Sequence, residues 1–353
     1  MENETPLGEV IKKKKDKKKA KKERLLADLE RKRQLEDNPG NEEGGLNNAK
    51  KIKYDNVFEE QKAKEQKGRT FTVSLALPGS ILDNAQSAEL RTYLAGQIAR
   101  ALAVFKIDEV VIFSDTKEDS TGNSQLVNIL TYLECPQYLR KDFFPIHRDL
   151  KFAGVLNPTD MPHHLRAYEE SLYREGIVRE RKSPSGGQSY AFVGLQKECE
   201  LDQELEAGIR VTVKLLSENK KGLKGQVVSP RTPCEVSGLY WGYSVRSCSS
   251  LSSVFTKCPF KGGYDLTIGT SERGQNIDKV ESLPDFKHLL IVFGGVKGLE
   301  AALQADTALE VDDPEPLFDL YLNTCPDQGS RTIRSEEAIL ISLSTLRPKI
   351  WNF

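Results

Sequence analysis

The fold class is decided by YDLTIGTSERG (264–274), HLLIVFGGVKGLE (288–300) and LFDLYLNTCPDQGSRTIRSEEAILISL (317–343). The first alternates apolar and polar residues and then breaks into a glycine-bounded turn, as a half-buried strand does. The second is a short apolar strand followed by Gly294, and the third predicts a strand, a polar loop and a helix. In a parallel sheet these three loops would share the carboxyl edge, where open α/β sheets bind ligands. Glycines there let backbone amides approach a ligand closely.

Segments nearer the N-terminus extend the same pattern. RTFTVSLALP (69–78) alternates with period two, and SAELRTYLAGQIARALAVF (87–105) has helical spacing with Ser87 as its N-cap. DEVVIFSD (108–115) predicts a buried parallel strand, and NSQLVNILTYL (123–133) predicts another helix. Alternating strands and helices predict an α/β layer with right-handed crossovers.

The stretch 157–234 has a different sequence pattern, with short β-like runs separated by glycine, proline and charged residues. Such spacing is typical of a small barrel or sandwich. We interpret it as an inserted domain that resembles an oligonucleotide-binding barrel; the alternative is a β-rich spacer without a ligand. Basic and aromatic side chains suited to a groove that tracks and stacks nucleotides are Tyr173, Arg174, Arg179, Arg181, Lys182, Tyr190, Phe192, Lys197 and Arg210.

The net charge of −1 averages two unlike parts. Residues 1–68 hold 19 Lys and Arg against 15 Asp and Glu, and ten of the basic residues lie within 12–24. Such a block repels itself, so we expect a disordered or solvated helical arm. It would neutralise nucleic-acid phosphates or act as a nuclear import signal; the alternative is a solubilising tail. The expected organisation is a basic arm (1–68), an α/β part (69–156), the inserted barrel (157–234) and a second α/β part (235–353).

Several classes of protein and site are excluded by composition and spacing. No stretch reaches the ~18 apolar residues of a membrane span, and no secretory signal precedes the lysines. The six cysteines form no C-x-x-C pair, which favours reduced intracellular thiols, and the four histidines lack zinc spacing, so no metal is expected. The GGxxG spacing departs from the dinucleotide fingerprint, and no P-loop is present.

Long segments resemble the SPOUT-class RNA methyltransferases over about 69–353: PGSILDNAQSAELRTYLAGQIARALAVFKIDEVVIF (78–113), LNPTDMPHHLR (156–166), YDLTIGTSERG, IVFGG (291–295) and NTCPDQGSRTIRSEEAILISL (323–343). The resemblance implies a trefoil-knotted domain that binds S-adenosyl-L-methionine, an inserted oligonucleotide-binding-like domain, and a homodimer. It also implies methylation of N3 of a uridine in large-subunit (28S) ribosomal RNA.

The resemblance also implies site residues. The cofactor residues would be Arg273 of TSERG, Gly294 of FGG, and Asn323 and Thr324 at the start of the last loop. Less directly, the pocket would be lined by Gly329, Thr332 and Ile339. Arg273 suits a carboxylate or phosphate clamp.

Methylation at N3 requires removal of a weakly acidic proton. Arg331 and Arg334 would stabilise the uridinate and Glu337 would accept the proton. The alternatives are a phosphate contact for either arginine and a helix N-terminal charge for Glu337.

Two functional classes remain open from the sequence. The alternative to an RNA methyltransferase is a non-enzymatic RNA-binding adaptor at kinetochores and spindle poles, with kinetochore or spindle proteins as partners. A tRNA substrate also remains open. The expected location is intracellular, in the nucleus or nucleolus and the cytoplasm, with kinetochore, spindle and centrosome association.

Overall fold

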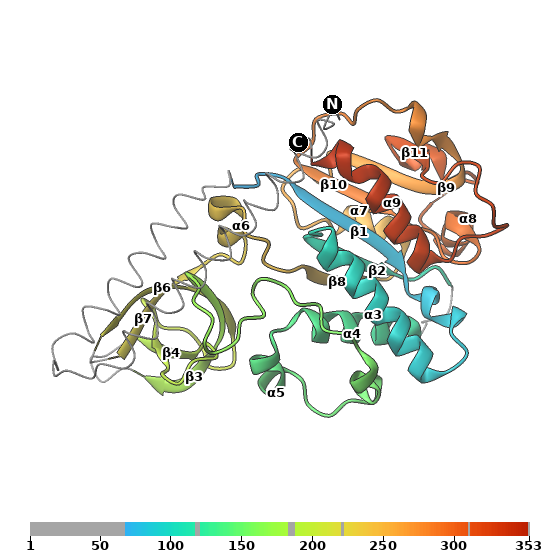
Figure 1. The fold of residues 1–353 in the computed structure, drawn as a ribbon. Coiled ribbons are helices and arrows are strands. Elements are labelled where there is room, and N and C mark those ends of the chain that lie inside the picture. Colours follow the sequence, from blue (N-terminus) through green and yellow to red (C-terminus); the bar gives the residue numbers. More distant parts are fainter. Residues whose placement is uncertain (1–67, 117–120, 183–187, 220–221, 310, 352–353) are drawn as a thin grey trace, which may run out of the picture. The chain divides into compact units, whose positions relative to one another are not determined.

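The computed structural model describes residues 68–116, 121–182, 188–219, 222–309 and 311–351. Apart from Gly68, the predicted basic arm lies outside them. A parallel sheet with the strand order β11-β9-β10-β1-β2-β8 forms the centre of the α/β domain (Figure 1). Its strands are β1 (Thr72–Pro78), β2 (Glu109–Phe113), β8 (Ser244–Cys248), β9 (Leu266–Asn276), β10 (His288–Val292) and β11 (Leu320–Asn323). The predicted parallel α/β layer is therefore confirmed.

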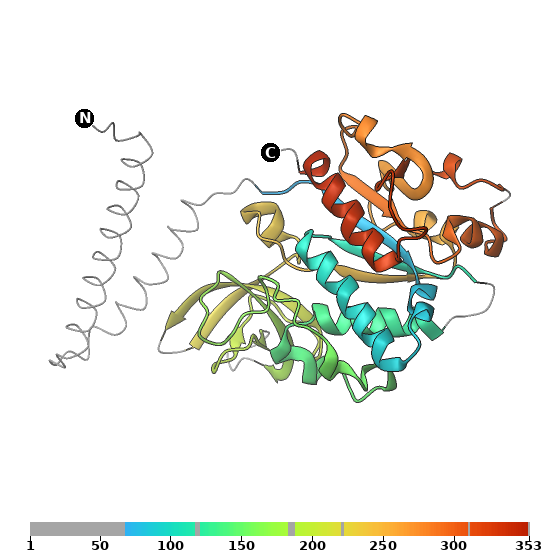
Figure 2. The same cartoon turned by 45° about the vertical axis from the view of Figure 1, so that its right-hand side comes forward.

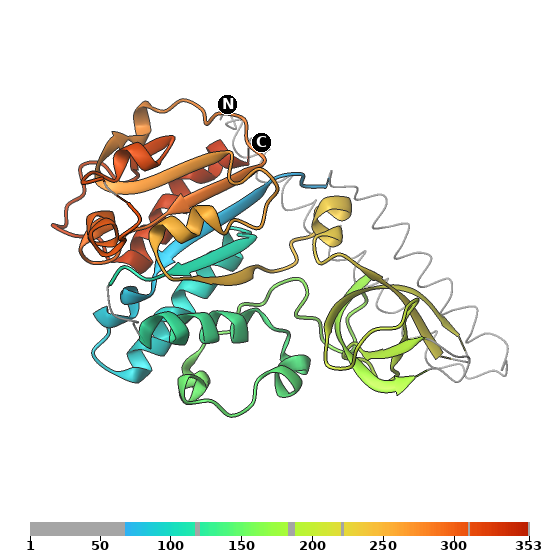
Figure 3. The ribbon, with the colours of Figure 1, turned by 180° about the vertical axis from the view of Figure 1, so that it is seen from behind.

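Helices cover both faces of this sheet. α3 (Ala88–Val104), α4 (Thr121–Glu134) and α9 (Ser335–Ile350) lie on one face, and α7 (Leu251–Thr256) and α8 (Gly298–Ala305) lie on the other (Figures 1 and 3). The period-two pattern of β1 explains the two cores, because Leu75 packs beneath the first set of helices and Ala76 beneath the second. Ser87 caps α3, with its Oγ accepting from the Leu90 amide at 3.2 Å, as predicted.

The inserted segment forms a closed five-stranded barrel with the order β3-β4-β5-β7-β6 (Figure 2). Its strands are β3 (Tyr173–Lys182), β4 (Ser189–Phe192), β5 (Cys199–Glu200), β6 (Arg210–Asn219) and β7 (Gly222–Val228). Val178, Ala191 and Val213 fill its interior. The prediction of a small barrel is therefore confirmed.

Short helices connect these parts. They are α5 (Arg140–Phe143), α6 (Thr232–Ser237) and the 3-10 turns η1 (Gly79–Asn84), η2 (Gln137–Leu139), η3 (Arg148–Leu150), η4 (Ala153–Val155), η5 (Ile277–Lys279) and η6 (Glu315–Leu317). Among the helices of the described ranges, none is both long and apolar enough to cross a membrane.

Candidate active site

The TSERG segment lies in a bulge inside β9, which corrects the expectation of a turn ending the strand. Tyr321 of β11 pairs with Gly269, but the next residue, Leu322, pairs with Gln275, so residues 270–274 loop out between them. The strand then continues to Asn276, because the chain past the bulge still has β11 as a hydrogen-bonding neighbour. The bulge that holds Arg273 begins after Gly269, which pairs with Val292 at the carboxyl end of β10.

Arg273 is free to meet a ligand at this edge. Its side chain is 75% exposed, and a guanidinium nitrogen lies 3.3 Å from Oε1 of Glu300 in α8. Exposed ion pairs of this kind contribute little to stability, so an anionic ligand group can replace Glu300 at low cost. Gly274 holds the bulge close to β11, since a Cβ there would lie 2.5 Å from the carbonyl carbon of Leu322.

The turn after β10 is built from glycines that approach backbone. A Cβ on Gly294 would lie 2.6 Å from the carbonyl carbon of Gly298 and 2.7 Å from the Leu299 amide nitrogen. Gly298 has φ of +74° and donates its amide to the carbonyl of Gly295 at 3.0 Å. The tight turn requires these glycines and leaves backbone polar groups beside the first turn of α8.

Side-chain hydrogen bonds of its first two residues connect the loop after β11 to β9 and to α9. Asn323 Nδ2 donates to the Glu272 carbonyl at 3.0 Å, and Asn323 Oδ1 accepts from the Cys325 amide at 3.0 Å. Asn323 thereby fixes the bulge of β9 to the loop. The Thr324 hydroxyl instead faces α9, at 2.6 Å from the Ser342 hydroxyl, and the Thr324 carbonyl accepts from the Thr345 hydroxyl of α9 at 3.5 Å.

The remaining predicted site residues follow along this loop. Gly329, Arg331, Thr332 and Arg334 are exposed, and Ile339 is fully buried in the main core beneath α9. Glu337 is exposed, and its Oε2 accepts from the Arg334 amide at 3.0 Å, which caps the first turn of α9. This contact is the structural alternative that the sequence offered for Glu337. The cofactor and catalytic roles of all ten residues stay predictions.

Sequence reasoning missed a polar group at the ends of β1 and β2. The Ser80 hydroxyl donates to Oδ2 of Asp115 at 2.5 Å, and both residues lie against Gly295. Asn123, at the start of α4, packs against Gly79, whose Cβ would lie 1.8 Å from its Oδ1. The available signal was that Ser80 and Asp115 each lie two residues after the end of a buried strand, close to the position that identified the other loops.

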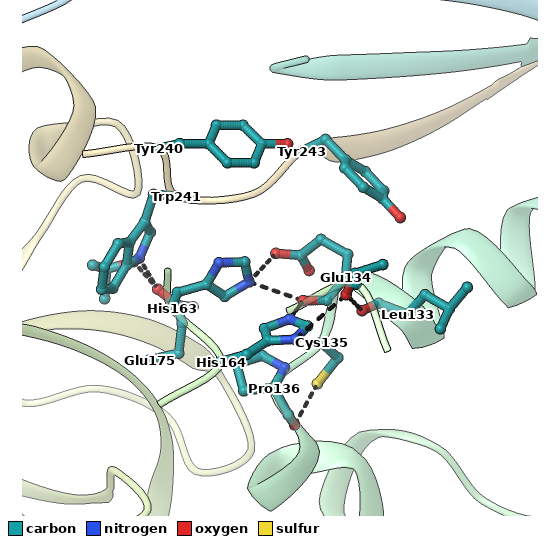
Figure 4. Close-up of polar contacts among 12 residues, drawn as sticks. Leu133, Glu134, Cys135, Pro136, His163, His164, Glu175, Tyr240, Trp241 and Tyr243 are labelled. Atoms are coloured by element: carbon teal, nitrogen blue, oxygen red, sulfur yellow. Dashed lines mark hydrogen bonds and ion pairs between the residues drawn. The ribbon is translucent and has the colours of Figure 1, made fainter. Parts of the chain in front are cut away.

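A second buried cluster joins the barrel to the α/β domain. Glu134, the last residue of α4, accepts both terminal nitrogens of Arg210 in β6, at 2.6 and 3.0 Å. Arg210 Nε also donates to Glu175 of β3 at 2.7 Å. The other oxygen of Glu175 accepts from Trp241 Nε1 at 2.6 Å (Figure 4). Because these contacts satisfy both buried carboxylates, the cluster fixes the barrel against the α/β domain.

The adjacent histidines belong to this cluster. Nε2 of His163 and Nε2 of His164 both contact the Glu134 carbonyl, at 2.9 and 2.7 Å (Figure 4). A carbonyl only accepts, so each Nε2 must carry the proton. Burial lowers the pKa of His164 to about 3, with a further contribution from His163. The two rings therefore have a structural role at the end of α4. In the described ranges, no group of three or more metal-ligating residues occurs.

Burial alone would raise the pKa of the Glu134 carboxyl. Nε2 of His163 also lies 3.0 Å from Oε1 of this carboxyl. The Arg210 guanidinium and this hydrogen bond from His163 outweigh the effect of burial and lower the pKa of Glu134 to about 2. Glu134 is therefore ionised in the folded protein at neutral pH.

The barrel surface corrects the predicted nucleotide groove. Tyr173 and Arg174 are both buried, and the Arg174 guanidinium donates inward to the carbonyls of Arg166 and Glu169. Arg210 belongs to the junction described above. The Lys182 side chain lies outside the described residues, and Lys197 is exposed.

Two basic and aromatic pairs of the predicted groove remain on β3 and β4. The Arg179 guanidinium lies 5.1 Å from the Phe192 ring centroid, and that of Arg181 lies 5.1 Å from the Tyr190 centroid. The groove is therefore reduced to this Arg–aromatic face.

The chain is similar to known RNA methyltransferases. Residues 72–346 match the family described as "Putative RNA methyltransferase". The chain is 56% identical over 311 residues to the 28S rRNA (uridine-N(3))-methyltransferase of Homo sapiens, covering 82% of each chain. It is 55% identical over 302 residues to the mouse protein of the same name, covering 81% of this chain and 78% of that one.

One solved structure also matches. It is the SpoU methyltransferase AviRb from Streptomyces viridochromogenes in complex with the cofactor AdoMet, with a TM-score of 0.31 and 9% identity. The match covers 82% of this chain and 62% of that chain. A TM-score this low does not establish a shared fold, so this neighbour adds nothing to the family match.

Proposed function

Because the chain belongs to the RNA methyltransferase family that it matches from residue 72 to residue 346, we propose that it methylates N3 of a uridine in 28S ribosomal RNA, with S-adenosyl-L-methionine as methyl donor. The observation that carries this proposal is the 56% identity to the human 28S rRNA (uridine-N(3))-methyltransferase. The alignment covers 82% of each chain, more than the α/β domain alone could supply.

The carboxyl edge has the groups that S-adenosyl-L-methionine needs. When bound, the cofactor supplies a methyl group on a positively charged sulfur. Gly294 and the backbone at Thr324 would hydrogen-bond its adenosine part, because backbone groups in a turn without side chains can approach a ligand closely. Arg273 would clamp its carboxylate in place of Glu300.

Arg331 and Arg334 would act on the RNA. Both are exposed on the loop that leads into α9, on the same edge as the glycine turn. As the N3 proton leaves, negative charge develops on the uracil ring, and a guanidinium close to it lowers the barrier. Glu337 is less suited to accept that proton, because its carboxylate already caps α9.

The knot and the dimer belong to the same proposal. We place the trefoil knot in the segment around 323–334, where the last loop is tied to both β9 and α9. For the homodimer, α3 and α9 pack together and expose Leu90, Tyr93 and Leu340. Exposed apolar side chains on adjacent helices mark a partner surface. Light scattering would report a dimer, and Leu340→Asp should shift it towards monomer; a wild-type monomer would contradict this part.

The barrel would hold the RNA through its Arg–aromatic face, because guanidinium and aromatic planes stack on bases without reading sequence. An enzyme of this specificity would meet its substrate in the nucleolus and cytoplasm. Association with kinetochores, the spindle or centrosomes stays a prediction from the sequence.

A direct assay tests the enzymatic proposal. The purified full chain is incubated with 28S rRNA and S-adenosyl-L-methionine, and modified nucleosides are mapped by mass spectrometry. We expect N3-methyluridine with the wild type and a loss of product with Asn323→Ala, which releases the β9 bulge from the loop. Isothermal titration that detects no S-adenosyl-L-methionine binding would reject the enzymatic proposal and favour an adaptor.

A further inference from the structure

Asp115 has an unused hydrogen-bond acceptor at the carboxyl edge. Asp115 is 8% exposed, and its Oδ2 accepts from the Ser80 hydroxyl. Its Oδ1 is shielded from solvent and has no hydrogen-bond partner among the residues that the structure describes. A buried acceptor that lacks a donor costs about 1–3 kcal/mol. Such an atom needs an explanation in a folded protein, and a donor supplied by a ligand is one.

Its place in the sheet indicates which ligand supplies the donor. The loops assigned to the cofactor follow β9, β10 and β11, which lie on one side of β1 in the strand order. Ser80 and Asp115 follow β1 and β2, on the other side of β10, and lie against the cofactor turn at Gly295. In-line methyl transfer places the nucleophile opposite the leaving sulfur. The edge over β1 and β2 is therefore the side from which the base would arrive.

Resting on the function proposed above, we propose that Asp115 contacts the target uracil and accepts its N3 proton, with Ser80 as the residue that positions the carboxylate. Uracil presents an N–H at N3, whereas cytosine presents a lone pair there. A fixed carboxylate hydrogen-bonds the first and repels the second, so the same oxygen selects the base and prepares it for reaction.

The proton and electron balance closes with these groups. The N3–H bond breaks and its proton passes to Oδ1 of Asp115. The N3 electron pair forms the bond to the methyl carbon, and the pair of the broken carbon–sulfur bond stays on sulfur. The carboxylate and the sulfonium both become neutral, so the step leaves no separated charge in a buried site.

Asp115→Asn tests the proposal because it keeps the shape but cannot take the proton. On the 28S rRNA that the wild type methylates, we expect kcat to fall about 100-fold or more at saturating substrates. The loss should shrink at alkaline pH, where uridinate forms without a base. The Ser80 hydroxyl and the Gly295 backbone, which lie against this carboxyl, carry no titrating group.

Binding gives a readout independent of methylation. Without the cofactor, the preference of the enzyme for the uridine-containing RNA over the same RNA with cytidine should fall about tenfold in Asp115→Asn, the change that loss of one charged hydrogen bond brings. The affinity for S-adenosyl-L-methionine should stay unchanged. Ser80→Ala should lower the preference for the uridine-containing RNA by a smaller factor and should also leave the affinity for S-adenosyl-L-methionine unchanged.

Asp108→Asn is the matched control, since Asp108 lies at the opposite end of the same strand and pairs with Arg69 and the Val73 amide. It should lose stability without losing kcat. An Asp115→Asn enzyme with unchanged kcat and base preference would overturn the proposal. So would a weakened cofactor affinity with full kcat at saturation, which would assign the carboxylate to the cofactor amine. A wild type without activity on any RNA would instead reject the proposed function.

Discussion

Gly294 is the residue at which the cofactor proposal depends most directly on backbone geometry. Gly294→Ala would place a methyl carbon 2.6 Å from the carbonyl carbon of Gly298, and that backbone cannot give way without moving the first turn of α8. We expect the affinity for S-adenosyl-L-methionine to fall about tenfold or more, the equivalent of about 1.4 kcal/mol. Isothermal titration measures it.

The control for this substitution is Gly154→Ala. A Cβ there meets nothing within 4 Å, so both affinity and stability should stay at wild-type values. Unchanged affinity in Gly294→Ala, with a folded protein, would contradict the placement of the cofactor at this turn.

The ionisation of Glu134 makes the stability of the folded protein depend on pH. Its folded pKa of about 2 lies below the ordinary value of 4.5, so the ionised form is favoured by folding. The corresponding stability is present above about pH 4.5 and is lost as the pH falls from there towards 2, by roughly 3 kcal/mol in all. The free energy of unfolding, measured with urea, should fall less between pH 5 and pH 3 for Glu134→Gln than for the wild type. Equal effects would contradict this assignment.

Among the elements, those with a clear period were predicted with nearly correct bounds. The alternation of 69–78 and the helical spacing of 87–105 reappear as β1 and α3, because each has one face or both faces buried. β5 was missed, since two residues carry no period, and the TSERG bulge was taken for a turn because its pairing with β11 is a tertiary contact. Local pattern decides an element only where tertiary pairing does not override it.

The cap of α3 is an element that can be tested by itself. Ser87 Oγ accepts from the Leu90 amide at an exposed helix start, so Ser87→Ala leaves that amide to water. We expect a loss of about 1 kcal/mol in the free energy of unfolding. Ser87→Asp should restore it, because a carboxylate also accepts there and suits the positive end of the helix. Equal free energies of unfolding for Ser87→Ala and Ser87→Asp would contradict a stabilising role of the cap.

At the scale of the whole molecule, sequence predicted the parallel sheet and the barrel but not how they are joined. Arg174 follows Tyr173 and Arg210 lies in the apolar run of β6, and nothing in the neighbouring residues shows that both guanidinium groups point inward. Glu134 and Arg210 are 76 residues apart, so their pairing exists only after both domains fold. The polar group at Asp115 was missed for a related reason: Ser80 and Asp115 meet only because β1 and β2 are neighbours.

Arg210→Met should uncouple the two domains. It leaves the carboxylates of Glu134 and Glu175 buried without their shared cation, which costs about 3–5 kcal/mol. In a Trp351→Phe background, fluorescence reports Trp241 at the junction, while circular dichroism reports the whole chain. With Arg210 in place, the two signals should change at one urea concentration. In Arg210→Met, the junction signal should change first, since the barrel no longer gains stability from the sheet.

Removing all three charges together, in Arg210→Met with Glu134→Gln and Glu175→Gln, should recover part of the lost stability, because no charge is then buried unpaired. Coincident transitions in Arg210→Met would mean that apolar contacts alone join the domains.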